Sequence, residues 1–277
     1  MWSGGGRSKA PVPAISHDCC IPPVVEAARA LSGLHIHVIG DSTLRMPVQY
    51  FGGRFVCPGQ PAHALCARNI NKFTPVLDKP MEGLVISFEY NRLTKDILRS
   101  EWWAKWVLSD RRNRAPDVVV LGCWLWHTFN GASLVQYEAE LRSVIGTLVS
   151  QPSYKAWWGA PGRLYWREAL PTEHSDGSVQ STTRCKAANS IARRVLAELA
   201  PSVVWVTQSE ILRHSSARSK RGEATSWAMT KDGLHFHGPV QVMLMRHLLA
   251  VIAEERRKRR WTTGSAANAS NASTIYI

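Results

Sequence analysis

The sequence predicts an α/β protein, a three-layer α/β/α sandwich with a mainly parallel central sheet. Short apolar runs alternate with helical patterns of about 10 to 18 residues along most of the chain. Hydrophobic residues make up 45% of the 277 positions and charged residues 20%, which suits a globular protein with a sizeable core. No internal repeat or linker divides the chain. We therefore expect one domain over residues 21–260, between a disordered segment 1–20 and a disordered tail 261–277.

The predicted elements follow one another as strand, loop and helix. "PPVVEAARALSG" predicts a short helix that ends at Gly33, and "LHIHVI" predicts the first buried strand. "TLRMPVQYF" favours a helix that Pro47 limits to its first turn. The other predicted strands are 83–90, 116–126, 162–170 and 202–208. The other predicted helices are 100–110, 134–149, 185–200 and 238–260.

The formal net charge is +13, and part of it lies in two basic runs, residues 218–221 and 255–261. Such runs are either contact surfaces for anionic partners or solvated loops and helix ends, and both interpretations stay open. No nucleic-acid-binding motif accompanies the charge, so we predict no nucleic-acid partner. A contact of residues 256–260 with an anionic surface stays open. No apolar stretch is long enough for a membrane-spanning helix.

The spacing of the cysteines argues against a zinc site, and the tryptophans have two interpretations. None of the six cysteines forms a C-x-x-C pair or a Cys/His zinc pattern, so we predict no metal site and no cofactor. Cys57 and Cys66 bracket a loop that a disulfide would close, whereas Cys123, inside an apolar run, is expected to be buried. The twelve tryptophans either pack in a core or line a cleft.

Two motifs at opposite ends of the chain carry chemistry. "GDSTLR" follows the first strand and places Ser42 at a strand-to-helix turn, where a serine is either a nucleophile or a helix cap. "DGLHF" precedes the last helix and supplies Asp232 and His235. Their spacing lets the carboxylate orient the imidazole while the other ring nitrogen faces a serine. Ser42, Asp232 and His235 together predict a catalytic triad at the carboxyl ends of the strands.

The order of these motifs resembles the SGNH/GDSL hydrolases, and more closely their PC-esterase branch. That branch includes trichome-birefringence-like polysaccharide O-acetyltransferases and fungal capsule O-acetylation proteins. "GDSTLR" resembles its G-D-S-x-x-R block, with Arg45 as the arginine. "DVVVLGCWLWH" resembles its apolar strand that runs into a loop bearing a tryptophan, here Trp126, and "REALPTEH" resembles a block with Arg167 and His174. The resemblance covers about residues 34–249.

The resemblance implies an SGNH-hydrolase-like fold and a serine acyl-esterase or O-acyltransferase. The acyl group, most simply acetyl, would pass from an ester to Ser42 and then to water or to a sugar hydroxyl. A carbohydrate or an acylated small molecule would be the substrate, with Trp126 and His174 as contact residues. The branch favours the secretory pathway or Golgi, but residues 1–20 lack the apolar core of a signal peptide, so the compartment stays open.

One position departs from the family pattern. Many members carry an asparagine after the third strand, where its amide binds the oxyanion, and Gly122 stands there in this chain. The Gly122 N–H or the side chain of Arg45 would then take part, and Asn91 and Asn130 are further candidates. The alternative function is a catalytically weak or inactive protein that binds glycans or lipids on the same scaffold.

Overall fold

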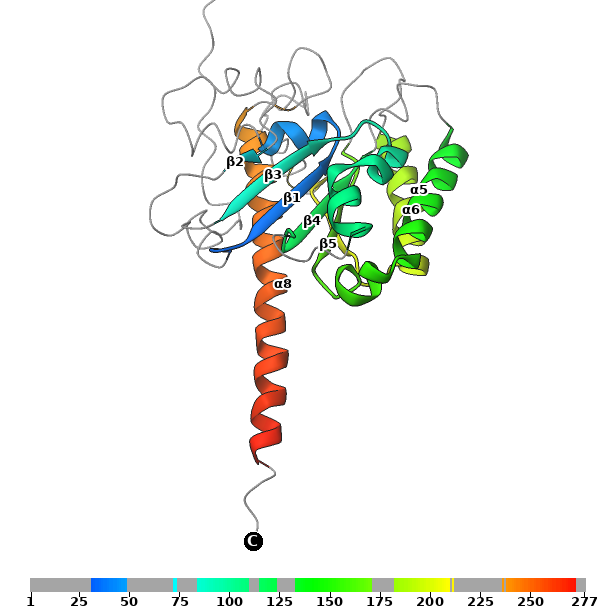
Figure 1. The fold of residues 1–277 in the computed structure, drawn as a ribbon. Coiled ribbons are helices and arrows are strands. Elements are labelled where there is room, and N and C mark those ends of the chain that lie inside the picture. Colours follow the sequence, from blue (N-terminus) through cyan, green and yellow to red (C-terminus); the bar gives the residue numbers. More distant parts are fainter. Residues whose placement is uncertain are drawn as a thin grey trace, which may run out of the picture.

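The computed structural model describes residues 31–48, 72–73, 84–109, 115–123, 133–170, 182–209, 211, 236 and 238–272 (Figure 1). The strands are β1 (His35–Gly40), β2 (Lys72–Phe73), β3 (Val85–Tyr90), β4 (Val118–Gly122), β5 (Leu164–Arg167) and β6 (Val204–Val206). The helices are η2 (Thr94–Arg99), η3 (Trp103–Val107), α5 (Leu134–Ser150), η4 (Tyr154–Trp158), α6 (Thr182–Leu199) and α8 (Gly238–Ala272). Residues 42–48 are also helical.

The strands form one sheet in the order β2-β3-β1-β4-β5-β6. β3, β1, β4, β5 and β6 run parallel, and the two-residue β2 pairs antiparallel with β3 at the edge. β1 and β4 lie in the middle, and most of their residues are buried. Strands buried on both faces read as nearly continuous apolar runs, which is why the sequence predicted them well.

Helices cover both faces of this sheet (Figure 1). Alternate residues of a strand point to opposite faces, so Ile39 and Val119 lie in a core with α5 and α6, while Val38 and Val120 lie in a second core with α8. The fold is therefore the three-layer α/β/α sandwich with a mainly parallel sheet that the sequence predicted.

Tryptophans fill much of the core beneath α5 and α6. Trp102, Trp103, Trp158 and Trp166 are each at most 5% exposed there. Trp102 contacts Trp158 edge-on, with the ring centroids 5.4 Å apart. The core interpretation therefore holds for these four side chains, of which Trp166 also lines a small pocket.

The structure differs from the expected elements at several places, among them η2 and η4, which were not predicted. The helix after β1 continues through Pro47 to at least residue 48, so Pro47 does not confine it to one turn. α8 extends to Ala272 and includes residues 261–272, which the sequence assigned to the tail. β2 was not predicted, since two residues give no readable pattern.

Other expectations concern cysteines and membranes. Cys123 is fully buried and free, as predicted, whereas Cys57, Cys66 and the helix expected before Gly33 lie outside the described residues. No helix in the described part of the chain is both long enough and apolar enough to cross a membrane.

Candidate active site

The order of the parallel strands creates a switch point between β1 and β4. After β1 the chain adds β3 on one side, and then crosses to add β4 on the other. Connections leave the carboxyl ends of β1 and β4 in opposite directions, and open α/β sheets bind ligands in the crevice that this creates. Gly40 ends β1 and pairs with Gly122, which ends β4. The predicted loop "GDSTLR" therefore starts at the switch point.

The two glycines allow the following helix to lie close to the strand ends. A Cβ atom on Gly40 would lie 2.4 Å from the Gly122 carbonyl oxygen and 2.6 Å from Leu44 Cδ1. A Cβ atom on Gly122 would lie 2.8 Å from the same Leu44 atom. This close approach gives a physical reason for glycine at position 122, where the resembling family carries asparagine.

Asp41 caps the helix of residues 42–48. Its Oδ1 accepts hydrogen bonds from the Thr43 N–H at 2.9 Å and the Thr43 hydroxyl at 2.6 Å. Its carbonyl oxygen accepts from the N–H groups of Leu44 and Arg45. Ser42 is thus the first helical residue, and its hydroxyl makes no hydrogen bond with any residue that the structure describes. The capping role left open for Ser42 belongs to Asp41.

A buried arginine reaches this turn from β5. Arg167 is 3% exposed, and its Nη1 donates a hydrogen bond to Thr43 Oγ1 at 3.1 Å. Its Nε is buried and finds no acceptor within the described ranges. Burial lowers the pKa of Arg167, and the nearby carboxylate of Asp41 opposes that effect. A Cβ at position 122 would meet Arg167 Cβ at 3.5 Å, an ordinary van der Waals contact, so the place of Arg167 does not require glycine there.

Two further polar side chains flank the turn on the β3 side. The Arg45 guanidinium lies over the Tyr90 ring, with Cζ 5.2 Å from the ring centroid. The Asn91 N–H donates to the Gly40 carbonyl oxygen at 2.9 Å, which brings Asn91 beside the end of β1. Its amide nitrogen Nδ2 is buried without an acceptor among the described residues. Asn91 and Arg167 therefore present buried, unused donors on opposite sides of β1.

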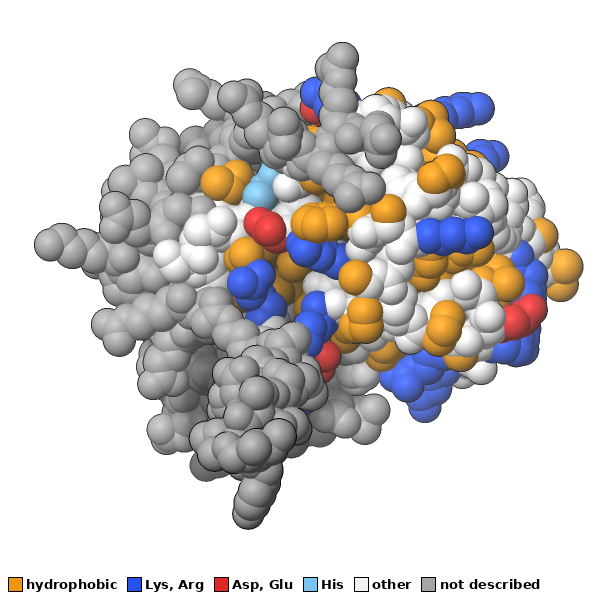
Figure 2. Space-filling model, turned by 60° about the horizontal axis from the view of Figure 1, so that its bottom comes forward, with side chains coloured by type: hydrophobic (Ala, Val, Ile, Leu, Met, Phe, Trp, Pro, Cys, Tyr) orange, Lys and Arg blue, Asp and Glu red, His pale blue; other side chains and the backbone are white. Residues whose placement is uncertain are grey.

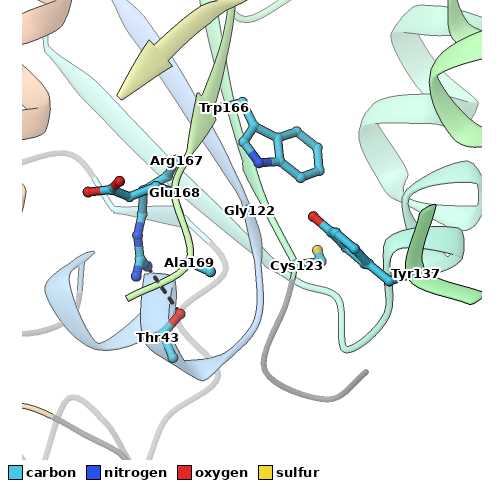
Figure 3. A pocket seen from close by; sticks show the side chains of 8 residues that line it. All are labelled: Thr43, Gly122, Cys123, Tyr137, Trp166, Arg167, Glu168 and Ala169. Atoms are coloured by element: carbon cyan, nitrogen blue, oxygen red, sulfur yellow. Dashed lines mark hydrogen bonds between the residues drawn. The ribbon is translucent and has the colours of Figure 1, made fainter. Parts of the chain in front are cut away.

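A small pocket opens next to Thr43 at the ends of β4 and β5. Its lining residues are Thr43, Gly122, Cys123, Tyr137, Trp166, Arg167, Glu168 and Ala169. Figure 3 shows Arg167 extending to Thr43 on one side of β4, while Trp166, Tyr137 and Cys123 gather on the other. Burial raises the pKa values of the Cys123 thiol and the Tyr137 hydroxyl, so both are neutral near pH 7. The apolar side of the pocket is uncharged, and its polar side carries the guanidinium of Arg167 and the carboxyl group of Glu168.

Of the predicted site residues, Ser42, Arg45 and Gly122 come together at this edge of the sheet. Asp232, His235, Trp126, His174 and Asn130 lie outside the described residues. The predicted triad therefore stays a prediction. Within the described ranges, no three His, Cys, Asp or Glu side chains are grouped so as to hold a metal ion.

Phe236, the residue after His235, is described and lies near the same edge. It is 4% exposed and packs in a small core with Leu170, which follows β5, and with Leu244 of α8. Its carbonyl oxygen accepts a hydrogen bond from Gln241 Nε2 at 3.0 Å. Phe236 therefore lies close to Leu170, the third residue after β5.

Arg167 and Thr43 were not predicted as site residues. Arg167 was read only as part of the "REALPTEH" motif, although a charged residue that ends the apolar run "LYW" already signals a special environment. No feature of the sequence marks Thr43, because its contact with Arg167 spans 124 residues.

No family model and no curated protein matches the chain. Several solved structures are similar to it. A lipase/acylhydrolase from Enterococcus faecalis shares 13% identity over 80% of this chain and 96% of its own, with a TM-score of 0.48. Axe2, an acetylxylan esterase from Geobacillus stearothermophilus, shares 15% over 81% and 96%, with a TM-score of 0.48. LAE5, an alpha/beta hydrolase enzyme from the metagenome of Lake Arreo, shares 16% over 80% and 95%, with a TM-score of 0.47. At these low values, the function must be inferred from the residues of this chain.

Proposed function

We propose that this chain is an SGNH-type serine esterase or O-acyltransferase of the PC-esterase kind, with Ser42 as its nucleophile. The capping of the 42–48 helix by Asp41 carries the proposal. Because Asp41 is the cap, the Ser42 hydroxyl makes no hydrogen bond with the described residues. Ser42 lies at the switch point of the sheet, next in sequence to Thr43, which binds the buried cation Arg167. A serine in that place has the position and the electrostatic surroundings that a nucleophile needs.

The reaction would proceed in two acyl transfers. His235, oriented by Asp232, takes the proton from Ser42 Oγ as this oxygen attacks the ester carbonyl. The tetrahedral intermediate collapses, the ester C–O bond breaks, and the leaving alcohol takes the proton from His235. Water or a sugar hydroxyl then attacks the acyl-serine and gives its proton to His235. The bond between the acyl carbon and Ser42 Oγ breaks, Ser42 Oγ takes the proton from His235, and the acid or a new ester is released. The burial of Phe236 beside Leu170 supports this role, because Phe236 is the residue next to His235 in the sequence and Leu170 follows β5.

The oxyanion would be bound by the Ser42 N–H, the Asn91 amide and the Arg167 guanidinium. The two side-chain donors are buried and partly unused, so they require little rearrangement when charge develops on the carbonyl oxygen. Loss of one such donor costs on the order of 3 kcal/mol in transition-state stabilisation. Asn91 and Arg167 would thus take the role of the asparagine that the resembling family carries where this chain has Gly122. Arg45 would lie at the rim, where it contacts Tyr90.

The pocket favours a short acyl group. Its apolar wall of Cys123, Tyr137 and Trp166 lies against packed core and leaves little room, which suits an acetyl group better than a long chain. The ester would be that of a carbohydrate or another acylated small molecule, whose alcohol part remains outside this pocket. We expect Trp126 and His174 to contact that part.

Fluorophosphonate labelling and p-nitrophenyl acetate hydrolysis test the proposal. We expect the wild-type chain to be labelled and to hydrolyse the ester. Ser42→Ala should abolish labelling and lower turnover by at least about 10³-fold. Ser143→Ala, which removes an exposed serine on α5, is the matched control and should behave as wild type. Wild-type turnover in Ser42→Ala would refute the nucleophile. A folded wild-type chain without labelling or turnover would favour the binding protein instead.

A further inference from the structure

A group of arginines lies at the opposite edge of the sheet, away from Ser42. Figure 2 views the molecule from this side, and blue Lys and Arg side chains border a hollow there. The group comprises Arg163, directly before β5, and Arg256 and Arg259 of α8. None of these residues takes part in the proposed reaction, so the inference drawn from them is independent of the proposed function.

The helical phase of α8 aims two of these arginines at the sheet. Leu248, Leu249 and Ile252 form the buried face of the helix and pack on the strands. Arg256 and Arg259 continue this face at positions i+4 and i+7 from Ile252. α8 passes the amino ends of the strands and extends beyond them (Figure 1). The stripe that packs against the sheet therefore turns from apolar to cationic where the sheet ends.

Three contacts hold Arg163 and Arg259 in place over the start of β5. Arg259 lies against the backbone of Gly162, where a Cβ would be 1.3 Å from Nη2. The Arg163 guanidinium stacks on Trp157, with Cζ 3.7 Å from the ring centroid, and its Nη1 donates to the Asp117 carbonyl oxygen at 3.0 Å. These guanidinium groups are thus fixed by packing, unlike the mobile ends of solvated side chains.

Positively charged side chains converge at the start of β5. Asp117 is the acidic partner of Arg163, at 3.7 Å, and Glu255 pairs with Lys258 at 2.8 Å. Arg256 has no ion-pair partner among the described residues. Burial lowers the pKa of Arg163, and repulsion from Arg256 and Arg259 adds to that effect. Three guanidinium groups that repel one another beside the carboxylate of Asp117 form a cationic surface that a bound dianion would stabilise.

We propose that Arg163, Arg256 and Arg259 form a binding site for a phosphate monoester dianion. Three guanidinium groups that converge from two elements can donate to several oxygens of a tetrahedral anion, whereas a carboxylate offers only two. A phosphate monoester carries close to two negative charges at neutral pH and presents three strong acceptor oxygens. The site lies on the far edge from Ser42, so it would bind a phosphorylated molecule while the carboxyl edge stays open.

Isothermal titration calorimetry of the full chain with inorganic phosphate, at low ionic strength and pH 7.5, tests the site. We expect saturable binding that Arg256→Ala and Arg259→Ala each weaken by about tenfold or more. Arg257→Ala is the matched control, because it removes the same charge one residue away, where Arg257 is exposed and paired with Glu254 at 2.7 Å. It should change the affinity by less than about twofold. Equal loss in Arg257→Ala would overturn the site in favour of unspecific attraction, as would the absence of saturable binding.

A second variant tests the geometry without changing the charge. Gly162→Ala places a methyl group where the Arg259 guanidinium lies, so phosphate binding should fall although all arginines remain. Unchanged affinity in a folded Gly162→Ala chain would overturn the place assigned to Arg259. Titrations with a phosphorylated sugar, and with phosphatidylcholine vesicles containing phosphatidylinositol 4-phosphate, distinguish a soluble ligand from a lipid headgroup. In both titrations Arg256→Ala and Arg259→Ala should weaken binding. Binding that neither substitution weakens would overturn the proposal.

Discussion

Arg167 donates a hydrogen bond from Nη1 to Thr43 Oγ1 across 3.1 Å, joining the end of β5 to the turn after β1. The Thr43 hydroxyl in turn donates a hydrogen bond to Asp41 Oδ1 at 2.6 Å. The three side chains form a hydrogen-bonded chain from cation to carboxylate at the turn that carries Ser42. Such a network in a buried setting holds its members in one geometry, and its charge acts at short range with little screening by water.

Arg167→Gln should lower kcat for p-nitrophenyl acetate by about 10²- to 10³-fold with little change in KM, because a cation near a developing oxyanion acts mainly in the transition state. Steady-state kinetics on a folded variant give both parameters. Arg167→Lys should recover only part of the loss, since an ammonium group cannot reproduce the direction of the guanidinium N–H groups.

Thr43→Val separates the two roles of Arg167. It removes the link between Arg167 and Asp41 but keeps the positive charge. If Arg167 acts on the oxyanion, the loss of kcat in Thr43→Val should stay below about tenfold. Equal losses in Thr43→Val and Arg167→Gln would mean that Arg167 only positions the turn.

Asn91→Asp tests the donor on the β3 side. The substitution keeps the shape of the side chain and replaces the buried donor Nδ2 by an acceptor oxygen. We expect kcat to fall by about 10²-fold or more, and the affinity for a boronic acid that mimics the tetrahedral state to fall in parallel. Unchanged affinity for the boronic acid, with a folded protein, would exclude Asn91 from the oxyanion site.

The glycine pair predicts an ordered series of stabilities. Gly40→Ala should lower the free energy of unfolding by about 3 kcal/mol, because its Cβ meets the backbone carbonyl of Gly122 at 2.4 Å, which cannot move away. Gly122→Ala should cost less, about 1 kcal/mol, because its nearest atom is the flexible end of Leu44 at 2.8 Å. Urea denaturation followed by tryptophan fluorescence measures both.

Gly146→Ala is the control for this series. Gly146 lies within α5, and a Cβ there would meet nothing within 4 Å. It should raise stability by about 0.5 to 1 kcal/mol, as alanine does in a helix interior. If Gly122→Ala and Gly40→Ala lowered the free energy of unfolding equally, the distinction between a clash with the backbone and a clash with a flexible side chain would be wrong.

Apolar runs made the strands of this fold predictable, because each parallel strand is buried on both faces. The turn at Ser42 was also predictable, since Gly-Asp-Ser directly follows such a run. The cap was not, because serine and aspartate both cap helices and only the hydrogen bonds to Asp41 separate them. Arg167 could not be placed at the site from its local sequence, because its contact with Thr43 depends on how β1, β4 and β5 are arranged in the sheet.

Glu89 on β3 should make stability depend on pH. Its carboxylate accepts N–H groups of Glu101 and Trp102 at the start of the 101–107 helix, and lies 3.3 Å from His37 Nε2. Burial alone would raise the pKa of Glu89, but these hydrogen bonds outweigh it and hold the pKa below its ordinary value of 4.5. The stabilisation is therefore present above pH 4.5 and is lost as pH falls through the lower, folded-state pKa.

Glu89→Gln tests this dependence by urea denaturation between about pH 6 and pH 3. The wild-type chain should lose stability toward the acid end more steeply than the variant, because the variant has no carboxylate to protonate at this position. The variant should also be less stable at pH 6, where the charged carboxylate accepts its hydrogen bonds most strongly. Glu101→Gln removes an exposed carboxylate from the adjoining helix and should keep most of the wild-type slope. Identical slopes in wild type and Glu89→Gln would show that protonation of another group controls unfolding in acid.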